Sequence, residues 1–207
     1  MIKFKIVTFL IVVGHFQILC ANNKVGNGGD VVSCKHDKQP QILDFYESEQ
    51  ELNLGTKEVS PFEVAKDRIL QLQKIAPKLY TQYLSRLQSI QDEIEFKDGV
   101  RLTDIKDSEH LFLPEDKSCE ILQVAIRKKV IGGAEKRFLF DKKIWDTLGT
   151  VGQAGLLTHE IIYEHLSKLG ETDSVKARKV NRFLYAKITD KAAFWKLIAD
   201  LEVPIYP

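Results

Sequence analysis

The sequence predicts an α+β fold, with helical segments around a small antiparallel sheet and a helical hairpin near the C-terminus. Apolar residues recur at helical spacing in residues 61–95 and again in 155–201, whereas residues 98–140 contain short alternating runs separated by turn residues. Because the helices and strands are segregated along the chain, they indicate the α+β class. With 207 residues, of which 44% are apolar, the chain is long enough for one substantial core.

Met1–Ala21 has the layout of a secretory signal peptide. Two lysines give a charged start, Ile6–Val13 is an apolar run, and Leu19-Cys20-Ala21 offers a cleavage site. The apolar run is too short to span a membrane comfortably. We therefore expect an exported protein, periplasmic or extracellular, whose mature part is a single domain, residues 22–207, with no membrane span.

The charge balance excludes one class of partner. The formal net charge of the chain is +1. Residues 1–21 carry Lys3 and Lys5 and no acid, so their removal leaves 28 of the 30 basic residues against all 29 acidic ones, a net charge of −1. A nearly neutral protein has no bulk attraction for nucleic acid. A cell-envelope component or a protein partner is expected instead, and the sequence names neither.

Signal removal also changes the cysteine count. Only Cys34 and Cys119 remain, an even pair in an oxidising compartment, and they lie 85 residues apart in the sequence. Closing a loop of that length stabilises a protein by about 4–5 kcal/mol in the chain-entropy model. We therefore predict a Cys34–Cys119 disulfide that ties the N-terminal strand to the middle of the chain.

The mature chain begins with a glycine-rich segment. Residues 26–30 read Gly-Asn-Gly-Gly-Asp and precede a short predicted strand, residues 31–34. Phosphate-binding loops have the opposite order, in which the strand comes first and a helix follows. We therefore interpret the segment as a structured turn, with Asp30 as a candidate binding residue. The next segment, residues 41–51, predicts a strand that leads into a helical turn.

The middle of the chain contains a helical part and then a strand-rich part. Ser60–Glu63 predicts a helix start, because a serine cap, a proline at the first helical position and a glutamate at the third form a capping box. Pro77 separates this helix from a second one over residues 78–95. Strands are predicted over residues 100–105, 110–114, 119–129 and 136–140, the last two as an antiparallel pair.

A helical hairpin is predicted near the C-terminus. Its first helix, Gly155–Leu169, ends at Gly170, which suits the left-handed conformation that often follows a helix. Asp173 and Ser174 are expected to cap the second helix, Val175–Lys187. Helical segments are also predicted over residues 141–148 and 192–201, and the apolar tail 203–207 is expected to pack down.

The helix Gly155–Leu169 is the element around which we expect the chain to be organised. Successive residues turn by about 100°, and His159 lies near the middle of one broad apolar arc. Leu157 and Ile161 form a second, narrower apolar strip, so we expect the helix to be covered on two sides. The remaining arc holds Glu160, Glu164 and Ser167. The apolar arc around His159 contains Leu156, Ile162, Tyr163, Leu166 and Leu169.

His159 and Glu160 begin like the zinc-peptidase motif H-E-x-x-H, in which two histidines one turn apart hold the metal and the glutamate activates the bound water. The fifth position here is Tyr163, and His165 lies well over 90° around the helix from His159. Because the second histidine ligand is missing, we expect no metal and no other cofactor. Three interpretations remain open, namely a core histidine, a catalytic His159–Glu160–Tyr163 site of another kind, and a metal site.

Two further expectations concern the partners of these groups. A carboxylate or a tyrosine from the strands is expected to orient the His159 ring, and His110 and Glu120 are the candidates. The basic residues at positions 176, 178, 179 and 182 indicate either a solvated face or a surface for an anionic glycan or lipid. Arg178 and Asn181 are the candidate binding residues of this group.

Three short motifs occur together, namely G-N-G-G-D-V-V-S-C (Gly26–Cys34), G-L-L-T-H-E-I-I-Y (Gly155–Tyr163) and G-E-T-D-S (Gly170–Ser174). They resemble an uncharacterised family of small exported proteins of predatory Gram-negative bacteria. The resemblance covers the mature chain and implies export and compatibility with a disulfide, and it implies no particular reaction. The His-Glu helix is also similar to the active helix of zincins with one ligand missing, which implies a degenerate, non-catalytic descendant.

Two functions are therefore expected from the sequence. The first is an exported, non-enzymatic protein with a structural or recognition role at the cell envelope. The alternative is an envelope hydrolase, similar to zincins, that uses His159 and Glu160. An enzyme would lose activity on replacement of His159 while staying folded, whereas a core histidine would cost stability.

Overall fold

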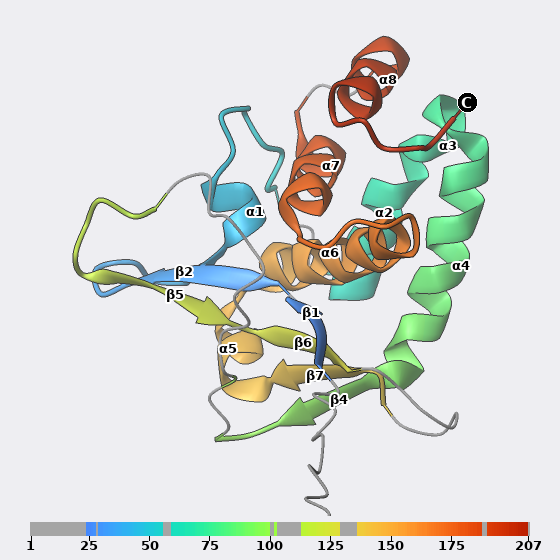
Figure 1. Cartoon of the computed structure of the whole chain (residues 1–207). Helices are drawn as coiled ribbons and strands as arrows, with labels where there is room; N and C mark the ends of the chain where they lie inside the picture. Colours follow the sequence, from blue (N-terminus) through green and yellow to red (C-terminus); the bar gives the residue numbers. More distant parts are fainter. Residues whose placement is uncertain are drawn as a thin grey trace, which may run out of the picture.

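The structure is a computed structural model, and it describes residues 24–27, 29–55, 59–99, 102, 113–128, 136–187 and 190–206 (Figure 1). It confirms the α+β class, with helices and short strands in one chain. The predicted signal peptide, residues 1–21, lies outside the described residues. So do most of the predicted strands 100–105 and 110–114 and the candidate partner His110.

The elements have the following bounds. The strands are β1 (Lys24–Asn27), β2 (Asp30–Cys34), β3 (Gln41–Ile42), β4 (Ile94–Lys97), β5 (Cys119–Gln123), β6 (Ala125–Lys128) and β7 (Phe138–Asp141). The helices are α1 (Leu43–Tyr46), α2 (Pro61–Leu70), α3 (Leu72–Ile75), α4 (Pro77–Glu93), α5 (Lys142–Thr147), α6 (Thr150–Lys168), α7 (Val175–Tyr185) and α8 (Lys191–Asp200).

The strands form two sheets, whereas the sequence predicted one small antiparallel sheet. The orders are β1-β6-β7-β4 and β3-β2-β5, and β4 runs parallel to β7 while the other pairs are antiparallel. The segment 119–129, predicted as one strand, breaks at Val124. The backbone N–H groups of Val124 and Ala125 both donate to the Gly29 carbonyl, at 3.1 and 3.3 Å. Because of this break, the chain passes from one sheet into the other.

Helix α6 lies between the sheets and the other helices, with α2, α4 and α7 packed against it (Figure 1). The sequence predicted cover on two sides, and the structure buries nearly the whole helix. Glu160 and Glu164, predicted on the polar side, are 0% and 4% exposed. Glu164 is held by Arg86 and Arg137, at 2.6 and 3.0 Å. Ion pairs therefore let Glu164 lie among the buried residues of the helix, while Glu160 accepts a hydrogen bond from the Gly29 N–H.

Glycine at position 155 allows α1 to approach α6 closely. A Cβ at this position would lie 2.5 Å from Ile42 Cδ1 and 2.6 Å from Phe45 Cζ, which is nearer than carbon atoms can pack. The short helix α1, which begins directly after β3, therefore lies against the middle of α6. This contact brings Asp44 of α1 next to His159 of α6, 115 residues apart in the sequence.

The predicted hairpin is present, with one difference at its cap. Gly170 has φ = 103°, the left-handed conformation expected after α6. Asp173 accepts a hydrogen bond from the N–H of Val175 at 2.9 Å and so caps α7. The side chain of Ser174 does not cap the helix, because its hydroxyl accepts a hydrogen bond from Arg178 instead.

Other local predictions are confirmed. The capping box at Ser60 is complete, since Ser60 and Glu63 each accept a hydrogen bond from the other's backbone N–H. The strand 136–140 returns antiparallel to the preceding one. Helix α4 ends at Glu93, two residues before the predicted end, because Ile94 onwards pairs with β7. The tail is packed down at Val203, whereas Tyr206 is 78% exposed.

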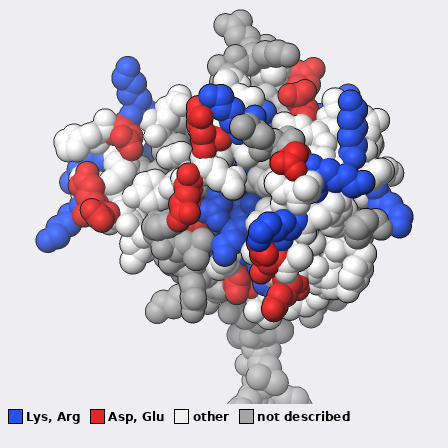
Figure 2. Space-filling view, turned by 90° about the horizontal axis from the view of Figure 1, so that it is seen from above, with Lys and Arg blue, Asp and Glu red and all other residues white. Residues whose placement is uncertain are grey.

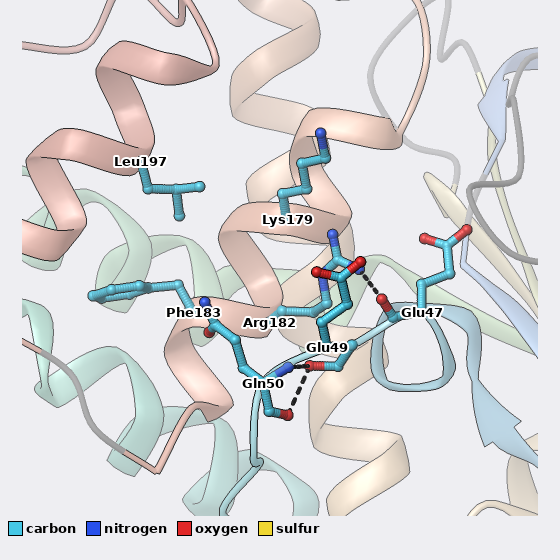
Figure 3. A pocket seen from close by; sticks show the side chains of 8 residues that line it. Glu47, Glu49, Gln50, Lys179, Arg182, Phe183 and Leu197 are labelled. Atoms are coloured by element: carbon cyan, nitrogen blue, oxygen red, sulfur yellow. Dashed lines mark hydrogen bonds between the residues drawn. The ribbon is translucent and has the colours of Figure 1, made fainter.

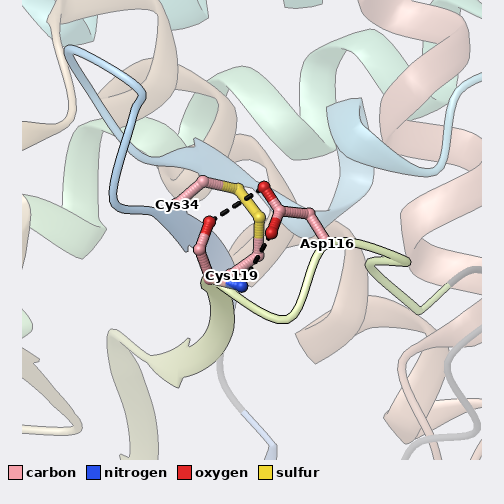
Figure 4. Close-up of a disulfide and its surroundings, with 4 residues drawn as sticks. Cys34, Asp116 and Cys119 are labelled. Carbon is pink, nitrogen blue, oxygen red and sulfur yellow. Dashed lines mark hydrogen bonds between the residues drawn. A yellow bond between two sulfur atoms is a disulfide. The ribbon is translucent and has the colours of Figure 1, made fainter.

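The predicted disulfide is also present. Cys34 and Cys119 lie opposite each other at the ends of β2 and β5, with their Cα atoms 3.9 Å apart (Figure 4). The turn that leads into β5 is closed by the N–H of Cys119, which donates to the Asp116 carbonyl at 3.0 Å. The bond therefore fixes the second sheet at the end away from α6.

Candidate functional site

His159 is buried in the centre of the protein and is bound by a carboxylate. Its side chain is 2% exposed, and its Nδ1 lies 3.0 and 2.9 Å from the two oxygens of Asp44. The sequence predicted that the orienting group would come from the strands, with Glu120 as a candidate. That prediction is wrong, because α1 supplies the partner.

Asp44 in turn binds Asn181 of α7. The Asn181 amide donates to Asp44 at 2.7 Å and to the Gly155 carbonyl at 2.9 Å. Its oxygen accepts a hydrogen bond from the Thr158 hydroxyl at 2.6 Å. These bonds join α1, α6 and α7 through groups that no water reaches, and such a network rigidifies the elements that it joins.

The charges of the Asp44–His159 pair are mutually stabilised. Burial works against the imidazolium, but the nearby Asp44 carboxylate outweighs it and raises the pKa of His159. Burial also works against the carboxylate, and His159 together with the Asn181 hydrogen bond nevertheless lowers the pKa of Asp44. Each partner therefore favours the charged form of the other, an arrangement in which Nδ1–H donates to the carboxylate.

One atom of His159 and one of Glu160 are left without a partner. Nε2 of His159 and Oε2 of Glu160 are buried, and neither forms a hydrogen bond within the described residues. The other oxygen of Glu160 accepts from the N–H of Gly29 at 2.8 Å. Burial raises the pKa of Glu160. Both unpaired atoms lie near the segment that connects the two sheets, because Gly29 approaches both side chains.

A second ion pair lies beside the first. Arg178 Nε donates to Glu47 at 2.8 Å, and Arg178 Nη1 donates to Ser174 at 2.7 Å. The side chains of Arg178 and Glu47 are 1% and 0% exposed. Arg178 and Asn181, the sequence candidates for a binding surface, therefore lie in the interior. We call Asp44, Glu47, Thr158, His159, Glu160, Arg178 and Asn181 together the buried polar cluster.

The remaining candidates form no hydrogen bond with His159 Nε2, although the Tyr163 ring lies near the His159 ring, with their centroids 6.1 Å apart. Tyr163 is 1% exposed, and its hydroxyl donates to the Thr172 carbonyl at 3.3 Å, so it anchors the link between α6 and α7. Asp30 is buried at the start of β2, opposite Gln123. Within the described ranges, no three His, Cys, Asp or Glu side chains are arranged to hold a metal ion.

A pocket opens to solvent next to the buried polar cluster. It has a volume of about 410 Å³ and lies between the segment that follows α1 and the helices α7 and α8 (Figure 3). We call it the α1–α7 pocket. It is lined by Glu47, Ser48, Glu49, Gln50, Lys179, Arg182, Phe183 and Leu197.

Two cations line the α1–α7 pocket. Arg182 Nη1 donates to the Glu47 carbonyl at 2.5 Å, so the guanidinium is held by the residue that also binds Arg178. Lys179 lies one turn away on the same face of α7. In the described part of the chain, neither cation forms an ion pair, and Glu49 only approaches Arg182. Burial lowers the pKa of Arg182.

Neither positive nor negative charge dominates the surface as a whole. Basic and acidic side chains are interspersed over the face shown in Figure 2, in agreement with the formal charge of +1. Attraction of an anion would therefore depend on the local placement of Lys179 and Arg182 rather than on the field of the whole protein.

Comparisons with protein-family models, with curated proteins and with solved structures found no match for this chain. Among the described residues, no helix is both long and apolar enough to cross a membrane. The geometry of the sites is therefore the basis on which a function can be proposed.

Sequence reasoning missed two carboxylates of the buried polar cluster. Asp44 and Glu47 lie three residues apart, so on a helical turn they point to the same side. They occur in the segment 41–51, for which the sequence predicted only a strand that leads into a helical turn. Two acidic residues at this spacing among apolar residues could have indicated buried carboxylates. Their partners on α6 and α7 could not be identified from the sequence.

Proposed function

We propose that this is an exported recognition protein that binds a small amphiphilic anion in the α1–α7 pocket. The observation that carries the proposal is the pair Lys179 and Arg182, which lines a pocket of about 410 Å³ without an ion-pair partner in the described residues. Pockets of about 300–1,000 Å³ are the usual size of small-molecule sites.

The walls indicate the class of ligand. Phe183 is 5% exposed and Leu197 is partly buried, and both line the pocket opposite the charged groups (Figure 3). An anionic head would meet the guanidinium of Arg182 and the ammonium of Lys179, and a short alkyl or acyl chain would cover the apolar wall. A phosphate or carboxylate on such a chain fits this chemistry.

The buried polar cluster supports the proposal by holding the pocket in shape. Arg178 fixes the carboxylate of Glu47, and the Glu47 carbonyl fixes Arg182. A pocket whose cation is already positioned loses less conformational freedom when the ligand binds. The Cys34–Cys119 disulfide supports an exported location, because disulfides persist in oxidising compartments.

The test uses octyl phosphate, with octanol and inorganic phosphate as probes for the two halves of the ligand. We expect saturable binding of octyl phosphate by titration calorimetry. Arg182→Gln should weaken it about 10–100-fold, since a hydrogen bond to a charged group contributes about 1.5–3 kcal/mol. The matched control is Lys196→Gln, on α8 outside the pocket, where Lys196 pairs with Asp200. Equal affinities in both variants, or no saturable binding, would contradict the proposal.

The second candidate function is a hydrolase that uses His159 and Glu160. The unpaired Oε2 of Glu160 favours it, because a general base needs a free acceptor, whereas Nε2 of a charged His159 carries a proton and acts as a donor. Both residues are at most 1% exposed, so a substrate would have to displace the segment at Gly29. If this function is correct, Glu160→Gln should lose activity toward an ester or peptide substrate while the stability of the protein stays unchanged.

A further inference from the structure

A second pocket lies on another part of the surface. It has a volume of about 390 Å³ and is formed where the chain after α8 runs back toward the start of α4 (Figure 1). It shares no lining residue with the α1–α7 pocket. We call it the α4–tail pocket. Its lining includes Lys78, Gln82, His165, Trp195 and Ile205.

The apolar residues that line the α4–tail pocket are held in place by contacts with neighbouring residues. The Trp195 indole N–H donates to the Ile75 carbonyl at 3.3 Å, and the ring packs edge-to-face on Phe194 at a centroid distance of 5.2 Å. On the other side, the N–H of Ile205 donates to the Val203 carbonyl at 2.7 Å. Val203 is 5% exposed and thus anchors the tail. Trp195 and Ile205 therefore contribute an aromatic and an aliphatic side chain, both held in place, to the lining of the pocket.

His165 gives the pocket a polar side with a defined proton. Its Nδ1 lies 3.1 Å from the hydroxyl of Tyr83, which is 1% exposed. Burial raises the pKa of Tyr83, so the hydroxyl keeps its proton, and the imidazole is the partner that can accept it in the described residues. Burial and the neighbouring Lys168 lower the pKa of His165, which is therefore neutral at pH 7. A neutral ring that accepts at Nδ1 carries its proton at Nε2.

Two exposed side chains of α4 complete the polar side. Lys78 and Gln82 are four residues apart and so lie on one face of the helix. Within the described residues, the ammonium of Lys78 has no ion-pair partner. The lining of the pocket thus contains an ammonium, an amide and an imidazole that carries an N–H donor, together with Trp195.

We propose that the α4–tail pocket binds a small aromatic carboxylate. The ring of the ligand would stack on Trp195 and contact Ile205, and its carboxylate would accept hydrogen bonds from His165 and Gln82 near the charge of Lys78. An aliphatic chain would fill the volume without using the flat indole wall. A neutral ligand would leave the ammonium unpaired. The proposal is independent of the function assigned to the α1–α7 pocket.

The test compares 2-naphthoate with its neutral analogue 2-naphthamide by titration calorimetry. We expect saturable binding of 2-naphthoate, at least about fivefold weaker in Lys78→Gln, because that variant removes one charge at the rim. The affinity for 2-naphthamide should be unchanged by the same substitution. Lys66→Gln is the matched control, since Lys66 is an exposed lysine of α2 outside the pocket.

A second variant locates the ligand. Trp195→Leu should weaken the binding of both naphthyl compounds by at least about tenfold, since it removes the stacking surface. Arg182→Gln should leave both affinities unchanged. The proposal would be overturned by the absence of saturable 2-naphthoate binding, by equal weakening in Lys66→Gln and Lys78→Gln, or by loss of binding in Arg182→Gln, which would assign the ligand to the α1–α7 pocket.

Discussion

Helices α1 and α7 pack against each other, and the polar residues on the buried side of this contact differ from those on the solvent side in what they bind. On the inner side, Asp44, Glu47, Arg178 and Asn181 are bound to one another or to α6 and are at most 1% exposed. On the outer side, Lys179 and Arg182 line an open pocket without ion pairs in the described residues.

The difference separates stability from recognition. A charge that is already paired and desolvated contributes to the position of the helices, and it has no remaining capacity to bind a ligand. A charge held at the surface by one hydrogen bond keeps its other donors for a ligand. Adjacent turns of one helix therefore serve two purposes, and the tests below separate them, from the largest expected effect to the smallest.

The largest effect is expected from Arg178→Met. This change leaves the carboxylate of Glu47 buried without its ion-pair partner, which costs about 3–5 kcal/mol of unfolding free energy. Urea denaturation followed by circular dichroism measures it. The control is Lys187→Gln, which breaks the exposed pair with Glu51 and should cost at most about 1 kcal/mol. Similar losses in the two variants would mean that the inner pair does not carry the stability assigned to it.

Gly155→Ala should destabilise the protein by about 1–3 kcal/mol, as overpacked cores do. The added Cβ would lie within 2.6 Å of Ile42 and Phe45 and would push α1 away from α6. Gly152→Ala, three residues earlier on the same helix, meets Leu148 at 3.4 Å and should be neutral or slightly stabilising, because alanine favours helix. Thermal unfolding of both variants is the measurement, and equal midpoints would contradict the close approach of α1.

The Asp44–His159 pair should give a smaller, pH-dependent effect. The pKa of His159 is raised in the folded state, so its contribution is complete below the unfolded value of 6.5 and is lost as the pH rises through the folded pKa. The pKa of Asp44 is lowered, so its contribution is lost as the pH falls below 3.8 through the folded pKa. The unfolding free energy should therefore decrease from pH 6.5 to pH 9.

Asp44→Asn isolates this contribution. The variant keeps a hydrogen-bonding side chain next to His159 but removes the charge that raises the histidine pKa, so the decrease above pH 6.5 should become smaller or reverse. The raised pKa of Glu160 also makes the unfolding free energy decrease as the pH rises, and Glu160 is present in both proteins. Chemical denaturation across the pH range gives the two profiles, and parallel profiles would show that the carboxylate does not charge the imidazole.

The smallest effect is expected from zinc. We expect the native protein, purified without chelator, to contain zinc well below stoichiometry. The protein compared with it is Tyr163→His, which restores the second histidine of the H-E-x-x-H spacing. Metal analysis of both proteins is the measurement. Stoichiometric zinc in the native protein would place His159 in a metal site and would favour the hydrolase.

Much of the fold could be predicted because its signals are local. The capping box at Ser60, the left-handed Gly170 and the strand pair around β7 follow from residues near one another in the sequence. The disulfide followed from an even pair of cysteines in a chain expected to be exported. The break at Val124 was missed, because Gly29, which causes it, lies almost a hundred residues earlier.

The candidate site was predicted in part for the same reason. His159 and Glu160 attracted attention through their motif, whereas Asp44 is 115 residues away from His159 and carries no motif. Arg178 and Asn181 were assigned to a surface because their helix is rich in basic residues. Which basic residue points inward depends on where α1 places Glu47, and helical spacing alone does not contain that information.

The measurement that tests the division between inner and outer groups most directly compares His159→Gln with Lys179→Gln. Each variant is assayed for its unfolding free energy and for its affinity for octyl phosphate. We predict that His159→Gln lowers stability and leaves the affinity of the folded protein within about twofold, whereas Lys179→Gln lowers the affinity about fivefold or more and leaves stability within about 0.5 kcal/mol. The account would be contradicted if His159→Gln abolished binding at unchanged stability, or if Lys179→Gln left the affinity unchanged.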